Sequence, residues 1–195
     1  MGYDPAKITI EEIKEALPNE DLSRRFQDFF IYVGNFYPHK NVERLIKAFL
    51  KVKTRYRLIL IGPDDYFTER IQKYIEGMNG KKGKVVLIKN PPTSDLVFFY
   101  KNAQAIIQPS LSEGFGLPLV EAAYFNCPII ASDIQVFREL WGNQYVSFDP
   151  KNTDDIANKI NGFTIRKPKI NYEEKLAKYS FKKMTEETLK IYFKI

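Results

Sequence analysis

Residues 105–132 constrain the fold of this chain more than any other stretch, because they combine two apolar runs with a glycine-rich turn. The runs at 105–108 and 128–131 have the length and the continuous apolar character of buried parallel strands. A polar turn at 110–116 leads into a helix that begins near Pro118. A proline is tolerated there, because an N–H in the first helical turn has no intrahelical partner. The stretch therefore predicts a strand, a turn, a helix and a second strand.

The turn places Gly114, Phe115 and Gly116 directly before this helix. Backbone N–H groups at a helix start carry partial positive charge, and glycine lacks the side chain that would keep an anion away. The turn is therefore a candidate phosphate-binding site. Glu113 and Glu121 bracket it, but pairs of glutamates are common on solvated helix faces. Spacing alone does not bring both carboxylates to one site.

The same alternation of strands and helices runs through the rest of the chain. Further strands are predicted at 29–33, 57–61, 85–88 and 145–148, and helices at 41–53, 66–78, 96–100, 133–140 and 154–160. Six short strands alternating with helices predict a doubly wound, Rossmann-like parallel α/β sheet, with its ligand site at the carboxyl ends of the strands. We assign residues 1–27 to a linker or N-terminal extension and residues 28–195 to one domain.

Composition narrows the classes of protein. The 195 residues, 44% of them hydrophobic, suffice for one core, and no apolar run approaches the ~20 residues of a membrane span. The single cysteine, Cys127, suits a reducing compartment and is expected to be a buried packing residue, so a cytoplasmic location is expected. The formal charge of +6 favours phosphate-bearing ligands or an anionic membrane surface. No clustered basic stripe indicates nucleic acid.

Several polar residues fall at the predicted carboxyl ends of strands, namely Gly34, Lys40, Gly62 and Glu113. Lys40 stands just before the helix at 41–53, which Asn41 is expected to cap. On position alone, a solvated surface lysine and a ligand-contacting lysine are equally good interpretations. The single histidine, His39, is expected to be a loop residue, and no cluster of histidine and cysteine predicts a metal site.

One longer pattern runs through the strand, turn, helix and strand of residues 105–132. It comprises Pro109-Ser110, Glu113-Gly114-Phe115-Gly116-Leu117-Pro118, Glu121-Ala122 and Cys127-Pro128-Ile129-Ile130-Ala131-Ser132. This pattern resembles the sugar-donor signature of the retaining GT-B glycosyltransferases of family 4, the group 1 glycosyltransferases. The resemblance extends over about residues 29–195 and matches only the carboxyl-terminal, donor-binding half of that two-domain architecture. It implies that residues 28–195 form a nucleotide-sugar-binding domain.

The resemblance also implies roles for individual residues. The expected donor-binding set is Gly34, Asn35, Lys40, Gly62, Glu113, Gly114, Phe115, Gly116, Leu117 and Glu121. Lys40 would neutralise the diphosphate together with the backbone amides of the turn, and Glu113 would hydrogen-bond the sugar hydroxyls, so that these two residues carry catalysis. Glu121 would hold the ribose, and no metal or other cofactor is implied. Asn35 departs from the arginine of many members and supplies no charge to the diphosphate.

The reaction implied is transfer of a hexose, of the mannose or glucose type, from a nucleoside diphosphate sugar to an acceptor hydroxyl in glycan or lipid-linked saccharide synthesis. The acceptor-binding half is expected on another domain or subunit, and the isolated domain is expected to be inactive. Association with a membrane surface stays open. Two alternatives remain: a non-catalytic nucleotide-sugar-binding subunit, which the departure at Asn35 favours, and a nucleotide-sugar epimerase on the same scaffold.

Overall fold

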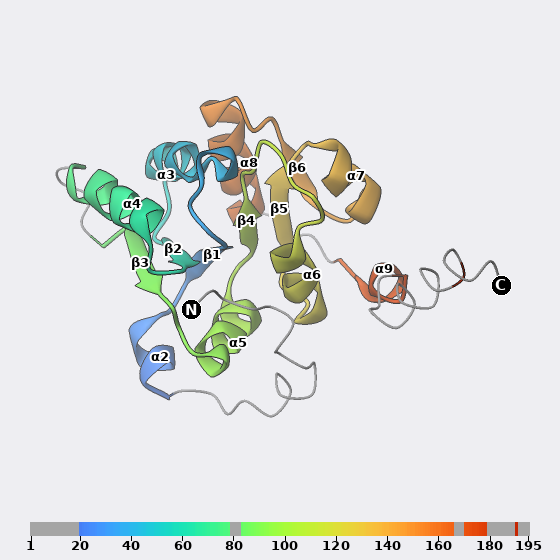
Figure 1. Ribbon diagram of the computed structural model, residues 1–195, viewed down its shortest axis with the longest axis horizontal. Coiled ribbons are helices and arrows are strands. Elements are labelled where there is room, and N and C mark those ends of the chain that lie inside the picture. The colour runs from blue at the N-terminus through green and yellow to red at the C-terminus, as the bar shows by residue number, and fades with distance from the viewer. Residues whose placement is uncertain (1–19, 79–82, 166–169, 179–189, 191–195) are drawn as a thin grey trace.

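The computed structural model describes residues 20–78, 83–165, 170–178 and 190 (Figure 1). In this part of the chain, six strands form one parallel sheet in the order β3-β2-β1-β4-β5-β6. The strands are β1 (Phe29–Val33), β2 (Arg57–Gly62), β3 (Val85–Lys89), β4 (Ile106–Gln108), β5 (Ile129–Ser132) and β6 (Val146–Phe148). The six predicted strands and the doubly wound parallel architecture are thereby confirmed.

Each helix predicted between residues 41 and 160 is present in the predicted order, and the helices at 20–25 and 38–40 were not predicted. The helices are α2 (Glu20–Arg25), the 3-10 helix η2 (Pro38–Lys40), α3 (Val42–Lys51), α4 (Tyr66–Glu76), α5 (Thr93–Asn102), α6 (Leu117–Tyr124), α7 (Gln135–Trp141), α8 (Thr153–Ile165) and α9 (Glu173–Leu176). Helix α8 continues beyond the predicted end at residue 160, because Phe163 adds a buried position that packs edge-on against Phe30. None of the helices in the described residues is both long enough and apolar enough to cross a membrane.

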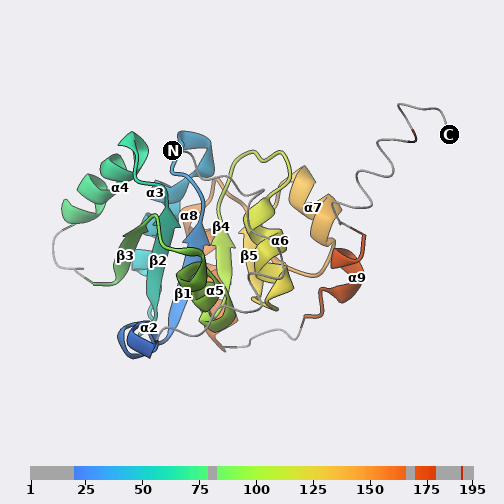
Figure 2. The same cartoon turned by 60° about the horizontal axis from the view of Figure 1, so that its bottom comes forward.

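Helices cover both faces of the sheet, and the side chains of each strand alternate between the two layers. In β1, Phe29, Ile31 and Val33 join the core beneath α5, α6 and α7. Phe30 and Tyr32 join the core beneath α3, α4 and α8. Figure 2 shows α5 and α6 in front of the sheet and α3 and α8 behind it. Burial on both faces explains why the strands read as continuous apolar runs.

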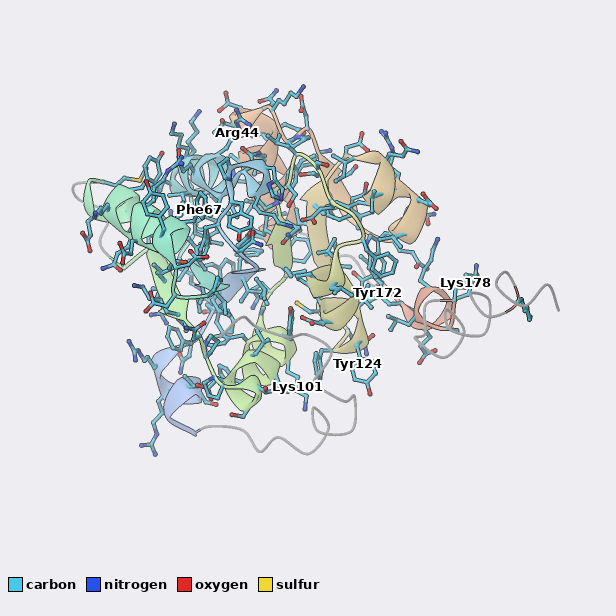
Figure 3. The ribbon with its side chains drawn as sticks, viewed as in Figure 1. Arg44, Phe67, Lys101, Tyr124, Tyr172 and Lys178 are labelled. Carbon is cyan, nitrogen blue, oxygen red and sulfur yellow. The ribbon has the colours of Figure 1, made fainter. Side chains whose placement is uncertain are left out.

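The two ends of the described chain also pack into this core. Tyr172, labelled in Figure 3, is buried, and its hydroxyl accepts a hydrogen bond from the backbone N–H of Ile129. Its ring lies edge-on to Trp141. Phe26 is buried against Phe99. The domain boundary at residue 28 stays a prediction, and residues 1–19 of the expected extension lie outside the described residues.

Close backbone approach shapes the loop that follows β1. A Cβ atom on Gly62 would lie 2.5 Å from the carbonyl oxygen of Gly34 and 2.5 Å from the ring of Phe36. The N–H of Gly34 donates to the carbonyl oxygen of Ile61 over 3.0 Å. The absence of a side chain at Gly62 therefore lets the loop after β1 lie directly over the end of β2.

Gly116 determines how the chain enters α6. It is the N-cap residue at φ +91°, where side-chain-bearing residues are strained, and Pro118 lies in the first helical turn as predicted. A Cβ atom on Gly116 would lie 2.7 Å from the ring of Phe137, whereas a Cβ atom on Gly114 would meet nothing within 4 Å. Gly116 is thus required by the fold, and Gly114 is not.

These two glycines provide a matched test of the turn. We expect Gly116→Ala to lower the free energy of unfolding by about 1–3 kcal/mol, from the left-handed φ and the contact with Phe137. Gly114→Ala should change it by less than about 0.5 kcal/mol, because its methyl group has space. Urea unfolding of both variants checks this, and equal losses would contradict the described turn.

Candidate active site

Two loops meet at the carboxyl ends of the adjacent strands β1 and β4. The N–H of Leu111 donates to the carbonyl oxygen of His39 over 2.8 Å. The Lys40 Nζ atom donates to both carboxylate oxygens of Glu113, at 2.8 and 2.7 Å. Figure 2 shows the segments that lead into α3 and α6 rising from the same edge of the sheet. The predicted convergence of Lys40 and Glu113 at the strand ends is confirmed.

Glu113 is held by more than its ion pair with Lys40. Its Oε1 atom also accepts hydrogen bonds from the Ser110 hydroxyl at 2.7 Å and from the Gln108 side-chain amide at 3.2 Å. The side chains of Lys40 and Glu113 are only 15% and 8% exposed, so both charges have lost most of their water. These extra hydrogen bonds offset part of the desolvation and fix the direction of the carboxylate.

Asn41 holds the Lys40 loop by a route that the sequence did not predict. We had expected this side chain to cap α3. It does not do so, because the residue adopts the left-handed conformation at φ 61°. Instead, the amide donates to the carbonyl oxygens of Pro109 and Pro150, at 3.0 and 2.8 Å. Arg44, labelled in Figure 3, donates to the Asn41 side-chain oxygen and to Pro150. Asn41 thereby ties together the loops that follow β1, β4 and β6.

Tyr32 holds the loop that follows β1 by a hydrogen bond from within the core. Its hydroxyl is buried within the core and donates to the carbonyl oxygen of Asn35. Burial raises the pKa of the Tyr32 hydroxyl well above its usual value, and the negative charge of Glu113 raises it further. The Asn35 side chain accepts a long hydrogen bond from the N–H of Tyr37. Tyr32 therefore remains protonated at neutral pH and holds the backbone at Asn35.

Glu121 has its own hydrogen-bond partner, which lies on a different helix. In the described structure its Oε2 atom accepts a hydrogen bond from the Tyr100 hydroxyl on α5, at 2.6 Å. Burial raises the pKa of Glu121, and the Tyr100 hydrogen bond opposes part of that rise. The hydrogen bonds of Glu113 and Glu121 thus go to different partners, and their sharing of one site stays a prediction.

The start of α6 adds backbone donors beside the ion pair. Within the described residues, neither Gly114 nor Gly116 donates its N–H to another group. The side chains of Phe115 and Leu117 are each 38% exposed. This arrangement can bind an anion through backbone amides and a lysine. The described residues contain no group of three or more His, Cys, Asp or Glu placed to hold a metal ion.

Sequence reasoning also missed the residues that hold the two carboxylates. Ser110 and Gln108 hold Glu113, and Tyr100 holds Glu121. Gln108 gave a signal that was available, because it ends an otherwise apolar run. Tyr100 gave none, since an aromatic residue on an amphipathic helix is ordinarily a core residue. Cys127 is buried, as predicted. His39 is exposed but lies in the 3-10 helix η2 and not in a loop.

Solved structures with a similar fold are glycosyltransferases. The structure of a glycosyltransferase from Rickettsia africae superimposes with a TM-score of 0.74 at 22% identity, over 97% of this chain and 53% of that one. The C-terminal domain of the group 1 family protein LpcC from Francisella tularensis gives a TM-score of 0.63 at 20% identity, over 78% of this chain and 87% of that one. These similarities confirm the Rossmann-like fold of the GT-B type.

Sequence comparison identifies the family, which the similarity of fold does not. The chain is 31% identical, over 94% of its length, to the O-antigen chain mannosyltransferase RfbU of Salmonella typhimurium, and covers 52% of that protein. It is 29% identical, over 69% of its length, to the O-antigen chain mannosyltransferase B of Escherichia coli, and covers 36% of it. The chain thus spans about half or less of these relatives. Because residues 13–183 match the family described as glycosyl transferases group 1, the chain belongs to the group 1 glycosyltransferases.

Proposed function

We propose that this chain is the carboxyl-terminal, donor-binding domain of a retaining GT-B glycosyltransferase of family 4. The enzyme moves a hexose, of the mannose or glucose type, from a nucleoside diphosphate sugar to an acceptor hydroxyl in glycan or lipid-linked saccharide synthesis. The observation that carries this proposal is the buried pair of Lys40 and Glu113 beside the amides that begin α6. The names of the O-antigen mannosyltransferase relatives favour mannose.

Lys40 and the turn amides act on the leaving diphosphate. Breaking the bond between sugar and phosphate leaves negative charge on the diphosphate, and fixed positive groups there lower the barrier. The Lys40 ammonium carries three protons, and its two bonds to Glu113 leave one for a phosphate oxygen. The N–H groups of Gly114 and Gly116 add partial positive charge. No metal is required for this neutralisation.

Glu113 acts on the sugar. A carboxylate near the diphosphate repels it in the ground state, but it stabilises the positive charge that develops on the sugar ring as the bond breaks. The interaction is therefore stronger in the transition state than in the bound substrate, which is the condition for catalysis. The hydrogen bonds from Ser110 and Gln108 hold the carboxylate in place for this role.

The acceptor is bound by a domain or subunit that corresponds to the other half of the relatives' length. We place the reaction in the cytoplasm, at or near the membrane face, where the positive charge of the chain favours an anionic surface. Asn35 contributes hydrogen bonds but no charge near the diphosphate. The donor site consists of the residues that the sequence analysis assigned to it, from Gly34 to Glu121.

Comparing nucleosides with nucleoside diphosphates as ligands distinguishes contacts to the ribose from contacts to the phosphates. Lys40→Gln keeps a hydrogen-bond donor for Glu113 but should weaken the binding of GDP or UDP by about 1.5–3 kcal/mol. The affinity for guanosine and uridine should be unchanged. Glu121→Ala should weaken nucleosides and diphosphates alike. Titration calorimetry checks both, with Lys51→Gln as the control, because Lys51 is exposed and pairs with the exposed Asp154 and not with Glu113. Equal losses from both variants for every ligand would refute these roles.

Glu121 also predicts a pH dependence for nucleoside binding. Ribose hydroxyls donate to the ionised carboxylate, and burial raises the pKa of Glu121 above 4.5. The proton is therefore released at a higher pH than from an ordinary glutamate, so uridine or guanosine affinity should rise with pH through a range above 4.5. The affinity of Glu121→Gln should not change with pH over that range. A rise of the same size in Glu121→Gln would remove Glu121 from the ribose site.

Transfer itself needs the acceptor half. The isolated 195-residue chain should transfer no sugar at a useful rate, and adding the missing half should restore transfer in the presence of EDTA. In the restored enzyme, Glu113→Gln should lower kcat more than it raises KM. Strict dependence on Mg²⁺ or Mn²⁺ would overturn this mechanism. Binding without transfer in the restored complex would indicate a binding subunit, and conversion of the sugar nucleotide without acceptor would indicate an epimerase.

A further inference from the structure

We infer that Gln108 is a positioning residue. It keeps the Glu113 carboxylate oriented toward the sugar when a bound phosphate competes for Lys40. The inference rests on the proposed function. Gln108 is the last residue of the central strand β4 and is 1% exposed. Its side-chain amide donates to Glu113 Oε1 at 3.2 Å and lies 3.4 Å from the Ser110 hydroxyl.

Fold stability does not explain a glutamine at this position. The preceding residues of β4, Ile106 and Ile107, are apolar and fully buried. The Oε1 atom of Gln108 is buried and has no hydrogen-bond partner among the described residues. An unpaired buried carbonyl is unfavourable, and an apolar side chain of the same size would avoid that cost. What the glutamine provides at this position is its N–H group, which donates to Glu113.

The amide orientation follows from Glu113. With the amide turned over, the Gln108 carbonyl oxygen would face the carboxylate of Glu113, and two acceptors would repel each other. Only the N–H group toward Glu113 is favourable. The unpaired oxygen is thus the consequence of holding the carboxylate.

The three groups that donate to Glu113 differ in how they are supported. Lys40 is the last residue of the short 3-10 helix η2 and Ser110 lies in the loop after β4, whereas Gln108 lies in a strand that is paired on both sides. A bound diphosphate competes for Lys40 and weakens its bond to Glu113. Gln108 is uncharged, so the phosphate does not compete for it strongly, and it continues to hold the carboxylate toward the sugar.

A double-mutant cycle tests this coupling on the 195-residue chain. The readout is the gain in affinity from GDP to GDP-mannose, and from UDP to UDP-glucose, measured by calorimetry. Gln108→Met should reduce this gain by about threefold or more, with GDP or UDP affinity unchanged or tighter. In the Glu113→Gln background, Gln108→Met should have no further effect. Ser132→Ala is the control, because Ser132 is fully buried beside Gln108 but contacts only its backbone oxygen.

Two measurements make the result decisive whether or not a ligand binds. The thermal midpoint of Gln108→Met should stay close to that of the wild type, because losing the hydrogen bond to Glu113 and removing the unpaired oxygen have opposite effects. Side-chain NMR relaxation at Glu113 should report greater motion in Gln108→Met than in the wild type or in Ser132→Ala. A lowered midpoint with unchanged Glu113 motion, or additive effects in the cycle, would overturn the inference. Failure of the wild type to bind any probe would refute the proposed function, while the relaxation data would still decide the role of Gln108.

Discussion

The ion pair between Lys40 and Glu113 is the interaction on which the rest of the site depends. The two residues are 73 positions apart, and both charges are largely removed from water. Such a pair is tolerated only when both partners stay satisfied, because removing one leaves an uncompensated charge. It is possible because β1 lies beside β4 in the sheet, with Ile31 paired to Ile106. This adjacency brings the loops that follow the two strands to one edge, as in other open parallel sheets that bind ligands.

Backbone conformation then fixes where these loops lie. Gly34 and Gly116 adopt positive φ values, and Asn41 adopts the left-handed conformation while its side chain binds the loops after β4 and β6. Gly62 permits the close approach of the Gly34 carbonyl. Each of these features serves the fold before it serves a ligand. The glycines of the binding signature are therefore of two kinds. At Gly62 and Gly116 a Cβ atom would collide with neighbouring atoms, whereas at Gly114 a Cβ atom would meet nothing within 4 Å.

The distribution of charge bears on how the proposed chemistry operates. Lys40 is already neutralised by Glu113, so the pair attracts a diphosphate less than a single lysine would. The backbone amides of the turn consequently contribute a larger share of the attraction. The two carboxylates have separate partners, since Glu121 is held by Tyr100 and Glu113 by Ser110 and Gln108. Under the proposed function, this separation would let Glu113 act on the transition state while Glu121 acts on affinity.

The sequence alone determined the strands, their alternation with helices and the glycine and proline that begin α6. It could do so because buried parallel strands and helix starts are encoded locally, in runs of a few residues. It also placed Lys40 and Glu113 at strand ends, and so predicted that they would meet. Only the tertiary structure decided that Asn41 binds carbonyl groups 68 and 109 residues away, that Tyr100 binds Glu121, and that Gln108 turns toward Glu113. These contacts depend on strand order and on the rotation of each helix about its axis. Both follow from how all the apolar faces pack together, so a local pattern such as the polar end of β4 does not identify the partner.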